Sequence, residues 1–202
     1  MILKILMTKF LSAVARTPGE VMRAAMLGLY RLAGWRVEGA APQTHKFVVI
    51  AAPHTSNWDL PLMLAVALQF RVRLRWMGKD TLFKPPFGWF MRVLGGIAID
   101  RSKTNDVVAQ MVEIFGQADR LAVAIPPEGT RSKTRYWKTG FYNIAHGADV
   151  PIALGFLDYA RKVGGIGMVM RTSGDYDTDL EAIKAFYAQV TPKFPDQVGT
   201  EE

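Results

Sequence analysis

Short apolar runs alternate with longer amphipathic stretches along most of the chain. A short continuous apolar run is typical of a buried strand, whereas apolar residues three or four positions apart indicate a helix. Strands are expected over residues 47–52, 74–77, 97–100, 121–125, 152–156 and 166–170. Helices are expected over residues 59–70, 107–116, 141–146 and 179–190, followed by a polar tail. This alternation predicts one α/β layered domain, with a central mostly parallel sheet flanked by helices.

The first 36 residues follow a different pattern, that of two amphipathic helices. In the first of these, apolar residues recur at helical spacing, namely Leu3, Leu6, Met7, Phe10 and Val14. The other side is lined by the polar and basic residues Lys4, Thr8, Ser12 and Arg16. Residues 17–20 (Thr-Pro-Gly-Glu) predict the start of the second helix, with Thr17 as the N-cap and Glu20 three residues later. This helix is expected to run to about Leu32 and to end at Gly34. We therefore expect a helical element over residues 1–36 and an α/β domain over residues 37–202.

Composition and charge add limits to this picture. The 202 residues carry a formal charge of +7, of which residues 1–36 contribute +5, from six bases and one acid. The remaining 166 residues therefore contribute only +2. Half of the residues are apolar and 21% are charged, which excludes disorder as the main state. The chain has no cysteine, so a disulfide, a thiolate zinc site and a cysteine nucleophile are excluded.

Two interpretations of the basic N-terminal segment compete. It is either a helical hairpin packed on the protein's own core or a pair of interfacial helices that bind anionic lipid. Nucleic acid is disfavoured as a partner, because the bases interleave with aliphatic residues and no DNA- or RNA-binding motif is present. No apolar run approaches the roughly 18–20 residues of a membrane-spanning helix. A secretory signal peptide is not expected, since Lys4 and Lys9 interrupt the apolar start.

The loop after the first expected strand of the domain holds a histidine and an aspartate, His54 and Asp59. On one continuous helix these residues would lie ~140° apart, so they meet only if the chain bends between them. Ser56 and Asn57 are residue types that begin helices, which would place His54 on the loop and Asp59 in the first turn. Asp59 could then hold the imidazole Nδ1–H and leave Nε2 free as a base. Taken alone, this spacing is weak evidence for catalysis.

Three further segments carry residues suited to ligand binding. In residues 126–132, Gly129 permits a close backbone approach and Arg131 offers a planar fork for phosphate, although Glu128 and Arg131 could simply pair in a strand-end turn. The strand over residues 97–100 is followed by Arg101, and the aromatic stretch 83–90 before it could be core or an apolar groove. Residues 150–152 (Val-Pro-Ile) read as the entry to a buried strand.

Together, these segments resemble in order and spacing the four motifs of the glycerolipid acyltransferase superfamily, whose type members are the PlsC-like 1-acylglycerol-3-phosphate acyltransferases. The motifs N-H-x-S-x-x-D, G-x-(I/F)-x-I-x-R, F-P-E-G-T-R-S and V-P-I match residues 54–59, 95–101, 127–132 and 150–152. A K-x-x-L-F segment is matched by residues 79–83, and the resemblance spans about residues 47–157. Pro53 stands where the family usually has asparagine and Pro126 where it usually has phenylalanine.

The resemblance implies acyl transfer from an acyl thioester to a hydroxyl of a lysophospholipid such as 1-acylglycerol 3-phosphate, in phospholipid biosynthesis. His54 would be the base and Asp59 would orient it, without a covalent intermediate. The residues that would bind substrate are Lys79, Arg101, Glu128, Gly129, Thr130 and Arg131. No cofactor is implied beyond the thioester co-substrate, which is acyl-CoA or acyl carrier protein.

The resemblance also bears on the N-terminal segment, because family members carry a comparable two-helix element. It implies a cytoplasmic protein that is peripheral on the inner face of the cell membrane and meets anionic lipids, with acyl carrier protein as a further partner. Three alternatives stay open: a lipid-binding protein of this fold without activity, acyl transfer to a different membrane alcohol, and a serine hydrolase that uses Ser56. The last lacks a G-x-S-x-G motif.

Overall fold

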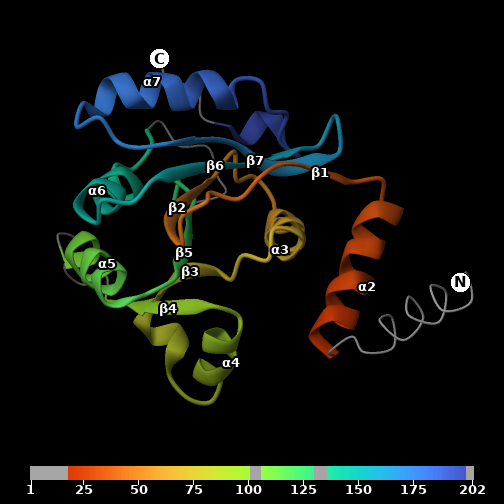
Figure 1. Cartoon of the computed structure of the whole chain (residues 1–202), viewed down its shortest axis with the longest axis horizontal. Coiled ribbons are helices and arrows are strands. Elements are labelled where there is room, and N and C mark those ends of the chain that lie inside the picture. Colours follow the sequence, from red (N-terminus) through yellow and green to blue (C-terminus); the bar gives the residue numbers. More distant parts are fainter. Residues whose placement is uncertain (1–17, 101–105, 130–135, 199–202) are drawn as a thin grey trace, which may run out of the picture.

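A seven-stranded sheet forms the centre of the protein in the computed structural model, which describes residues 18–100, 106–129 and 136–198. The strands lie in the order β1-β7-β6-β2-β5-β3-β4 (Figure 1). Their bounds are β1 Arg36–Gly39, β2 Lys46–Ala51, β3 Leu74–Lys79, β4 Gly96–Ile99, β5 Leu121–Ile125, β6 Ile152–Asp158 and β7 Val163–Met170. All neighbouring strands pair in parallel except β6 and β7, which are antiparallel. The predicted α/β fold with a mostly parallel sheet is confirmed.

Helices cover both faces of the sheet. They are α2 Pro18–Leu32, α3 Asp59–Gln69, α4 Gly88–Val93, α5 Asp106–Gln117, α6 Gly140–Gly147 and α7 Tyr176–Tyr187, with short 3₁₀ helices η1 Asp80–Phe83 and η2 Pro195–Gln197. The connections through α3 and α4 step toward the β4 edge, whereas those through α5 and α6 step back. Because such crossovers are right-handed, the two pairs lie on opposite faces. Figure 1 shows α2, α3 and α4 on one side and α5, α6 and α7 on the other.

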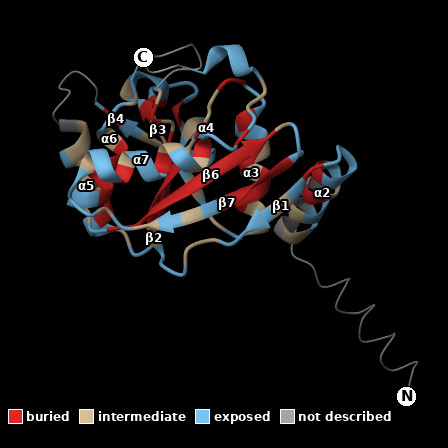
Figure 2. Cartoon of the chain, turned by 90° about the horizontal axis from the view of Figure 1, so that it is seen from above, coloured by how far each residue is buried: buried red, intermediate tan, exposed pale blue. Residues whose placement is uncertain are grey.

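The core has one layer on each side of β2. Val48 and Ile50 of this strand pack with the α5 and α6 side, and Phe47 and Val49 pack with the α3 side. Successive strand residues point to opposite faces, so a strand buried on both faces must be apolar throughout. This explains the uninterrupted apolar run in the sequence, and Figure 2 shows the buried residues concentrated along the central strands.

Helix α2 packs against α3 through its C-terminal half. It ends as predicted, with Gly34 at φ 82°. Tyr30 and the following Trp35 are buried in the core layer beside α3, while Leu29 and Leu32 are 67% and 86% exposed. The described part of the N-terminal element thus contacts the protein's own core and also presents apolar surface to solvent. The first predicted helix lies outside the described residues.

The structure departs from the sequence predictions at several elements. Strand β1 was not predicted, because Arg36–Gly39 has no apolar run and pairs only with the sheet neighbour β7. The stretch over residues 83–96 contains α4, although its glycine and proline content disfavours a helix. Helix α7 begins three residues early, because the Asp175 side chain caps it by accepting from the Asp177 and Thr178 N–H groups. Among the described residues, no helix has the length and hydropathy to span a bilayer.

Candidate active site

The predicted catalytic loop and the predicted binding turn lie beside each other at one edge of the sheet. β2 and β5 are parallel neighbours whose last paired residues are Ile50 and Ile125. The loop over residues 52–58 follows β2, and the turn over residues 126–129 follows β5. Because the carboxyl ends of parallel strands meet at the same edge, the two segments are brought together there, which is where α/β sheets place ligands.

His54 and Asp59 form a dyad at this edge. The chain bends as predicted, with His54 on the loop and Asp59 as the first residue of α3, and Nδ1 of His54 lies 3.0 Å from Oδ2 of Asp59. The same carboxylate oxygen accepts the backbone N–H groups of Thr55 at 3.0 Å and Ser56 at 2.9 Å. The Ser56 hydroxyl accepts from the Trp58 N–H at 3.1 Å and is buried, which fits the role of a turn residue. The loop therefore folds around the Asp59 carboxylate.

The other oxygen of Asp59 is held by a residue far away in the sequence. Tyr159, directly after β6, donates its hydroxyl to Oδ1 of Asp59 at 2.7 Å. Burial alone raises the pKa of Asp59, but the hydrogen bonds from His54, Tyr159 and Ser56 outweigh it and lower that pKa below its usual value. An ionised Asp59 can only accept, so Nδ1 of His54 carries the hydrogen. Nε2 of His54 is then left as the proton acceptor, on a side chain that is 26% exposed.

Glu128 connects the binding turn to the dyad loop. Its Oε1 accepts the backbone N–H of His54 at 3.3 Å, while its Oε2 is buried without a hydrogen-bond partner among the described residues. Burial raises the pKa of Glu128. Gly129 adopts φ 67°, and a Cβ there would lie 2.8 Å from Nζ of Lys138. Glycine is therefore favoured at this turn by the backbone conformation, whereas the flexible end of the Lys138 side chain could move aside.

The remaining predicted binding residues divide into two groups. Lys79 is exposed at the end of β3, with β5 between its strand and β2, and no contact joins it to the dyad. Arg101, Thr130 and Arg131 lie outside the described residues.

Tyr159 was missed by the sequence analysis. An aromatic residue after a strand is ordinary, and 100 positions separate it from Asp59, so no local pattern marks it. The segment after α7 was missed for the same reason. There, the backbone N–H of Phe194 donates to Oγ1 of Thr55 at 3.3 Å, and Nζ of Lys193 lies 5.3 Å from the centre of the Trp58 ring.

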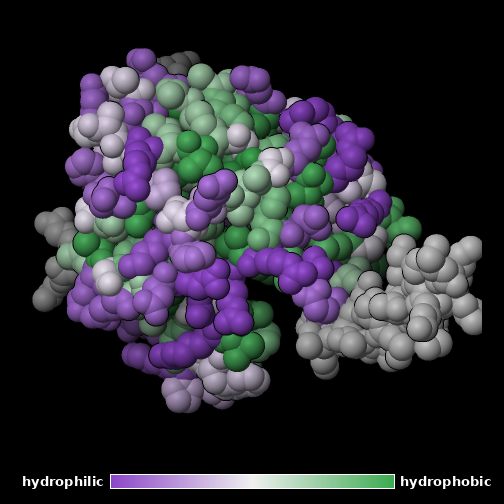
Figure 3. Space-filling model, viewed as in Figure 1, coloured by the Kyte–Doolittle hydropathy of each residue, from purple (hydrophilic) through white to green (hydrophobic). Residues whose placement is uncertain are grey.

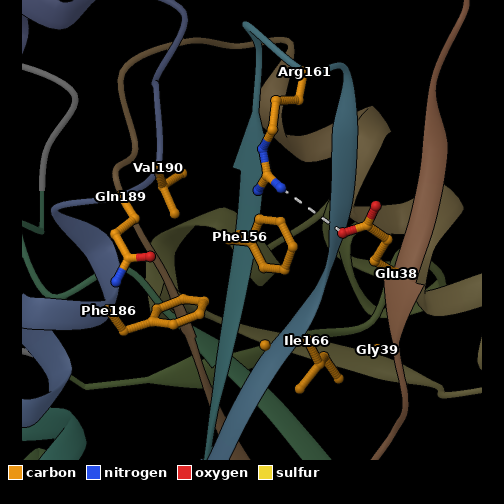
Figure 4. A pocket seen from close by; sticks show the side chains of 9 residues that line it. Glu38, Gly39, Phe156, Arg161, Ile166, Phe186, Gln189 and Val190 are labelled. Atoms are coloured by element: carbon orange, nitrogen blue, oxygen red, sulfur yellow. Dashed lines mark ion pairs between the residues drawn. The ribbon is translucent and has the colours of Figure 1, made fainter.

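A pocket of about 300 Å³ lies elsewhere, among β1, β6, β7 and the end of α7. Figure 4 shows Phe156 and Phe186 inside it and the Arg161–Glu38 ion pair, 4.0 Å long, beside them. No predicted site residue lines it. In the part of the chain that the structure describes, no three histidine or acidic side chains gather as a metal site would require.

Comparisons with known proteins identify a family and a fold. The model of the family described as "Acyltransferase" matches residues 35–153. An uncharacterised acyltransferase of Schizosaccharomyces pombe is 30% identical over 120 residues, and a 1-acyl-sn-glycerol-3-phosphate acyltransferase of Streptococcus pneumoniae is 25% identical over 108 residues. These matches cover 54% and 49% of this chain, and the chain spans 40% of the length of each relative.

A solved structure has the same fold. It is that of the 1-acyl-sn-glycerophosphate acyltransferase PlsC from Thermotoga maritima, which is 19% identical with a TM-score of 0.55. The likeness covers 91% of this chain and 88% of that one.

Proposed function

This chain belongs to the acyltransferase family, and we propose that it moves a fatty acyl group from an acyl thioester to a hydroxyl of a lysophospholipid such as 1-acylglycerol 3-phosphate. The observation that carries this proposal is the His54–Asp59 dyad, with its 3.0 Å hydrogen bond at the carboxyl edge of the sheet. The dyad has the parts of a general base, because Asp59 fixes the tautomer of the imidazole and Nε2 is left to accept a proton.

In the proposed reaction, Nε2 of His54 takes the proton of the acceptor hydroxyl as its oxygen attacks the thioester carbonyl carbon. The tetrahedral intermediate then expels the thiolate, which receives that proton from the imidazolium, so an ester and a free thiol are formed. A thioester is already activated, so no covalent intermediate on the enzyme is required. Asp59 stabilises the imidazolium while it exists.

We assign binding of the acceptor to Glu128 as well. Its Oε2 is buried and unpaired among the described residues, and it belongs to the same carboxylate that contacts the His54 backbone. A carboxylate repels phosphate, so we assign to Oε2 a hydroxyl of the acceptor. Filling that position would remove the cost of an unsatisfied buried acceptor.

The phosphate of the acceptor is assigned to the cations of the motifs. Arg131 and Arg101 would bind it, and Gly129 and Thr130 would let the backbone approach it. These four roles rest on the matched motifs. Lys79 would help to position the donor, whose phosphates are anionic whether it is acyl-CoA or acyl carrier protein, and no further cofactor is needed.

The proposed enzyme works in phospholipid biosynthesis as a cytoplasmic, peripheral protein on the inner face of the cell membrane. The net charge of +5 in residues 1–36 favours anionic lipid. The exposed Leu29 and Leu32 of α2 supply apolar surface beside that charge. Both features suit an enzyme whose substrate and product lie in a bilayer.

The test is an assay of the full chain with one acyl-CoA or acyl carrier protein and a panel of lysolipids and membrane alcohols, read by product mass spectrometry. We expect diacylglycerol phosphate from lysophosphatidate and no product from the His54→Ala variant. If product forms only from another alcohol, that alcohol is the acceptor and the proposed acyl-transfer chemistry stands. No turnover with any acceptor would instead favour a lipid-binding protein of this fold.

A further inference from the structure

The segment between β3 and β4 presents large apolar side chains to solvent. Six of them are between 43% and 71% exposed: Leu82, Phe87, Trp89, Phe90, Val93 and Leu94, which we call the α4 surface. Soluble proteins rarely leave a contiguous apolar cluster of this kind uncovered, so its exposure indicates a contact surface. Figure 3 shows the apolar patch over α4 with hydrophilic residues around it.

The α4 surface is held in a defined shape. Phe83, in the same segment, is buried against Gly78 and Gly96, where any Cβ would lie within 3.0 Å of its ring. The Arg92 guanidinium lies 5.4 Å from the centre of that ring and donates to the Phe83 carbonyl oxygen at 3.2 Å. The exposed aromatic residues are therefore fixed to the sheet by a buried one.

This part of the chain is also the second concentration of positive charge. Residues 73–94 hold one acid, Asp80, and five bases, namely Arg73, Arg75, Lys79, Lys84 and Arg92, for a net charge of +4. No ion pair joins any of these bases to a described acid. Since residues 1–36 carry +5 and the whole chain +7, all other residues together carry −2. The domain is thus not evenly charged, and much of its positive charge belongs to the segment that carries the α4 surface and to the strand before it.

The position of the α4 surface relates it to the rest of the molecule. The segment leaves β3 at the carboxyl edge of the sheet, the edge that holds the His54–Asp59 dyad. It lies on the same face of the sheet as α2 and α3 (Figure 1). Helix α2, which lies on that face, also has exposed apolar residues, namely Leu29 and Leu32.

We propose that the α4 surface is a membrane contact separate from residues 1–36, which places Phe87, Trp89 and Val93 at the headgroup level of an anionic bilayer. Tryptophan and phenylalanine suit the boundary between headgroups and acyl chains, and the surrounding lysines and arginines attract anionic headgroups. A second contact in addition to residues 1–36 would fix the orientation of the protein on the lipid. The proposal deepens the proposed function by stating how the site meets its lipid, but binding itself needs no turnover.

The test is co-flotation of the full chain with vesicles of phosphatidylcholine alone or with added phosphatidylglycerol. We expect the Trp89→Ser/Val93→Ser variant to lose about tenfold or more of its binding to the anionic vesicles. Val169→Ser, which removes an exposed valine from β7, is the matched control and should bind as the parent does. Circular dichroism checks that each variant is folded.

Two outcomes would overturn the proposal. One is equal vesicle binding by Trp89→Ser/Val93→Ser and the parent. The other is loss by that variant of binding to acyl carrier protein while its vesicle binding is kept, which would make the α4 surface a docking site for an acidic protein. Neither outcome depends on acyl transfer, so a failed activity assay leaves the test intact.

A different observation concerns Tyr159 and the dyad. The Tyr159 ring packs edge-on against Trp35, with ring centres 5.0 Å apart, and its backbone N–H donates to the Thr191 carbonyl oxygen at 2.8 Å. Its hydroxyl is thereby aimed at Oδ1 of Asp59, 2.7 Å away. Burial raises the pKa of Tyr159 further above its usual value, so the hydroxyl remains a donor.

We infer that Tyr159 is a positioning residue, which holds the Asp59 carboxylate in the plane that the His54 Nδ1–H requires. This inference rests on the proposed function. With both carboxylate oxygens bonded, Asp59 cannot rotate without breaking hydrogen bonds on both sides. The other titratable groups that face the dyad are Glu128 after β5 and, behind Tyr159, Tyr30 of α2.

The test uses Tyr159→Phe, which keeps the ring on Trp35 and removes the hydroxyl. We expect kcat to fall about tenfold with KM unchanged, and the acid limb of the rate profile to move to higher pH. The limb moves because a carboxylate with one donor fewer holds the imidazolium proton more strongly. Tyr30→Phe is the matched control, since the Tyr30 hydroxyl donates to the Arg36 carbonyl oxygen, at 3.4 Å, and makes no hydrogen bond to Asp59.

A parent rate and pH profile in Tyr159→Phe would overturn this role for Tyr159. An inactive parent protein would count against the proposed function instead. In that case, the rate at which diethyl pyrocarbonate modifies His54, followed by mass spectrometry across pH, gives the same comparison without turnover. Equal rates for the parent and Tyr159→Phe at every pH would also overturn the inference.

Discussion

The backbone N–H of His54 donates a hydrogen bond to Oε1 of Glu128 at 3.3 Å, and this bond joins the loop after β2 to the turn after β5. The two residues are 74 positions apart and meet because β2 and β5 are parallel neighbours. The base and the proposed acceptor-binding carboxylate are therefore linked directly, and each can be tested by substitution.

Replacing His54 with alanine should strongly lower the rate of acyl transfer, because no other described side chain lies at the Asp59 carboxylate as a base. A loss of about 10²–10⁴-fold is expected for removal of a general base. The exposed His45, bonded to Arg120 on the protein surface, provides the control His45→Ala. Retained activity in His54→Ala, with a thermal midpoint like that of the parent, would contradict the mechanism.

Replacing Glu128 with glutamine should stabilise the protein at neutral pH while lowering its activity. Burial raises the pKa of Glu128 in the folded state, so ionisation there costs stability as pH rises from about 4.3, the unfolded value, through the folded value. The variant avoids this cost, so we expect it to unfold at a higher temperature than the parent at pH 8 and at a similar temperature near pH 4. Thermal unfolding of both proteins across that range measures the difference.

The control for the Glu128→Gln substitution is Glu181→Gln, on the exposed face of α7. It should change neither the thermal midpoint nor the activity. A Glu128→Gln protein that is less stable than the parent at pH 8 would show that the carboxylate has a partner which offsets its burial.

Replacing Arg131 with alanine should weaken binding of the phosphorylated acceptor more than binding of the thioester. The expected loss is about 2–4 kcal/mol in acceptor kcat/KM if the guanidinium binds phosphate in a buried, charge-assisted contact. Steady-state kinetics with each substrate varied in turn give the two KM values. Arg171→Ala, which removes an exposed partner of Asp149, is the control. An unchanged KM for the acceptor would contradict the assignment of Arg131 to phosphate binding.

The N-terminal bases should contribute to binding on anionic vesicles. Deleting residues 1–36 would also remove Tyr30 and Trp35 from the core, so the better variant is Lys4→Gln/Lys9→Gln/Arg16→Gln. Each base near an anionic surface contributes about 1 kcal/mol, so a loss of about 3 kcal/mol in binding is expected at low salt. Vesicle sedimentation measures this loss. Equal binding by the variant and the parent would show that these bases do not contribute to membrane binding.

Local sequence patterns were sufficient for most helices and strands. The end of α2 followed from Gly34, whose positive φ stops the helix locally. The Glu20 carboxylate, predicted to help cap the start, binds the side chains of Arg23 and Arg71 instead. β5 was predicted at its observed bounds, Leu121–Ile125, because burial on both faces demands an uninterrupted apolar run. The bend between His54 and Asp59 was also predicted locally, from Ser56 and Asn57 as residue types that begin helices. In the structure neither of them caps α3, and the Asp59 carboxylate holds the bend by accepting the Thr55 and Ser56 N–H groups.

Partners that lie far apart in the sequence were decided by the tertiary structure alone. β1 exists because β7 offers it a free edge, and the exposure of Phe87 and Trp89 depends on how α4 sits against the sheet. The contact of Tyr159 with Asp59 spans 100 positions. Periodicity and capping report which face of an element is apolar and where it ends, because both depend on near neighbours. Which residues meet at the dyad depends instead on strand order and pairing, which carry no local signal.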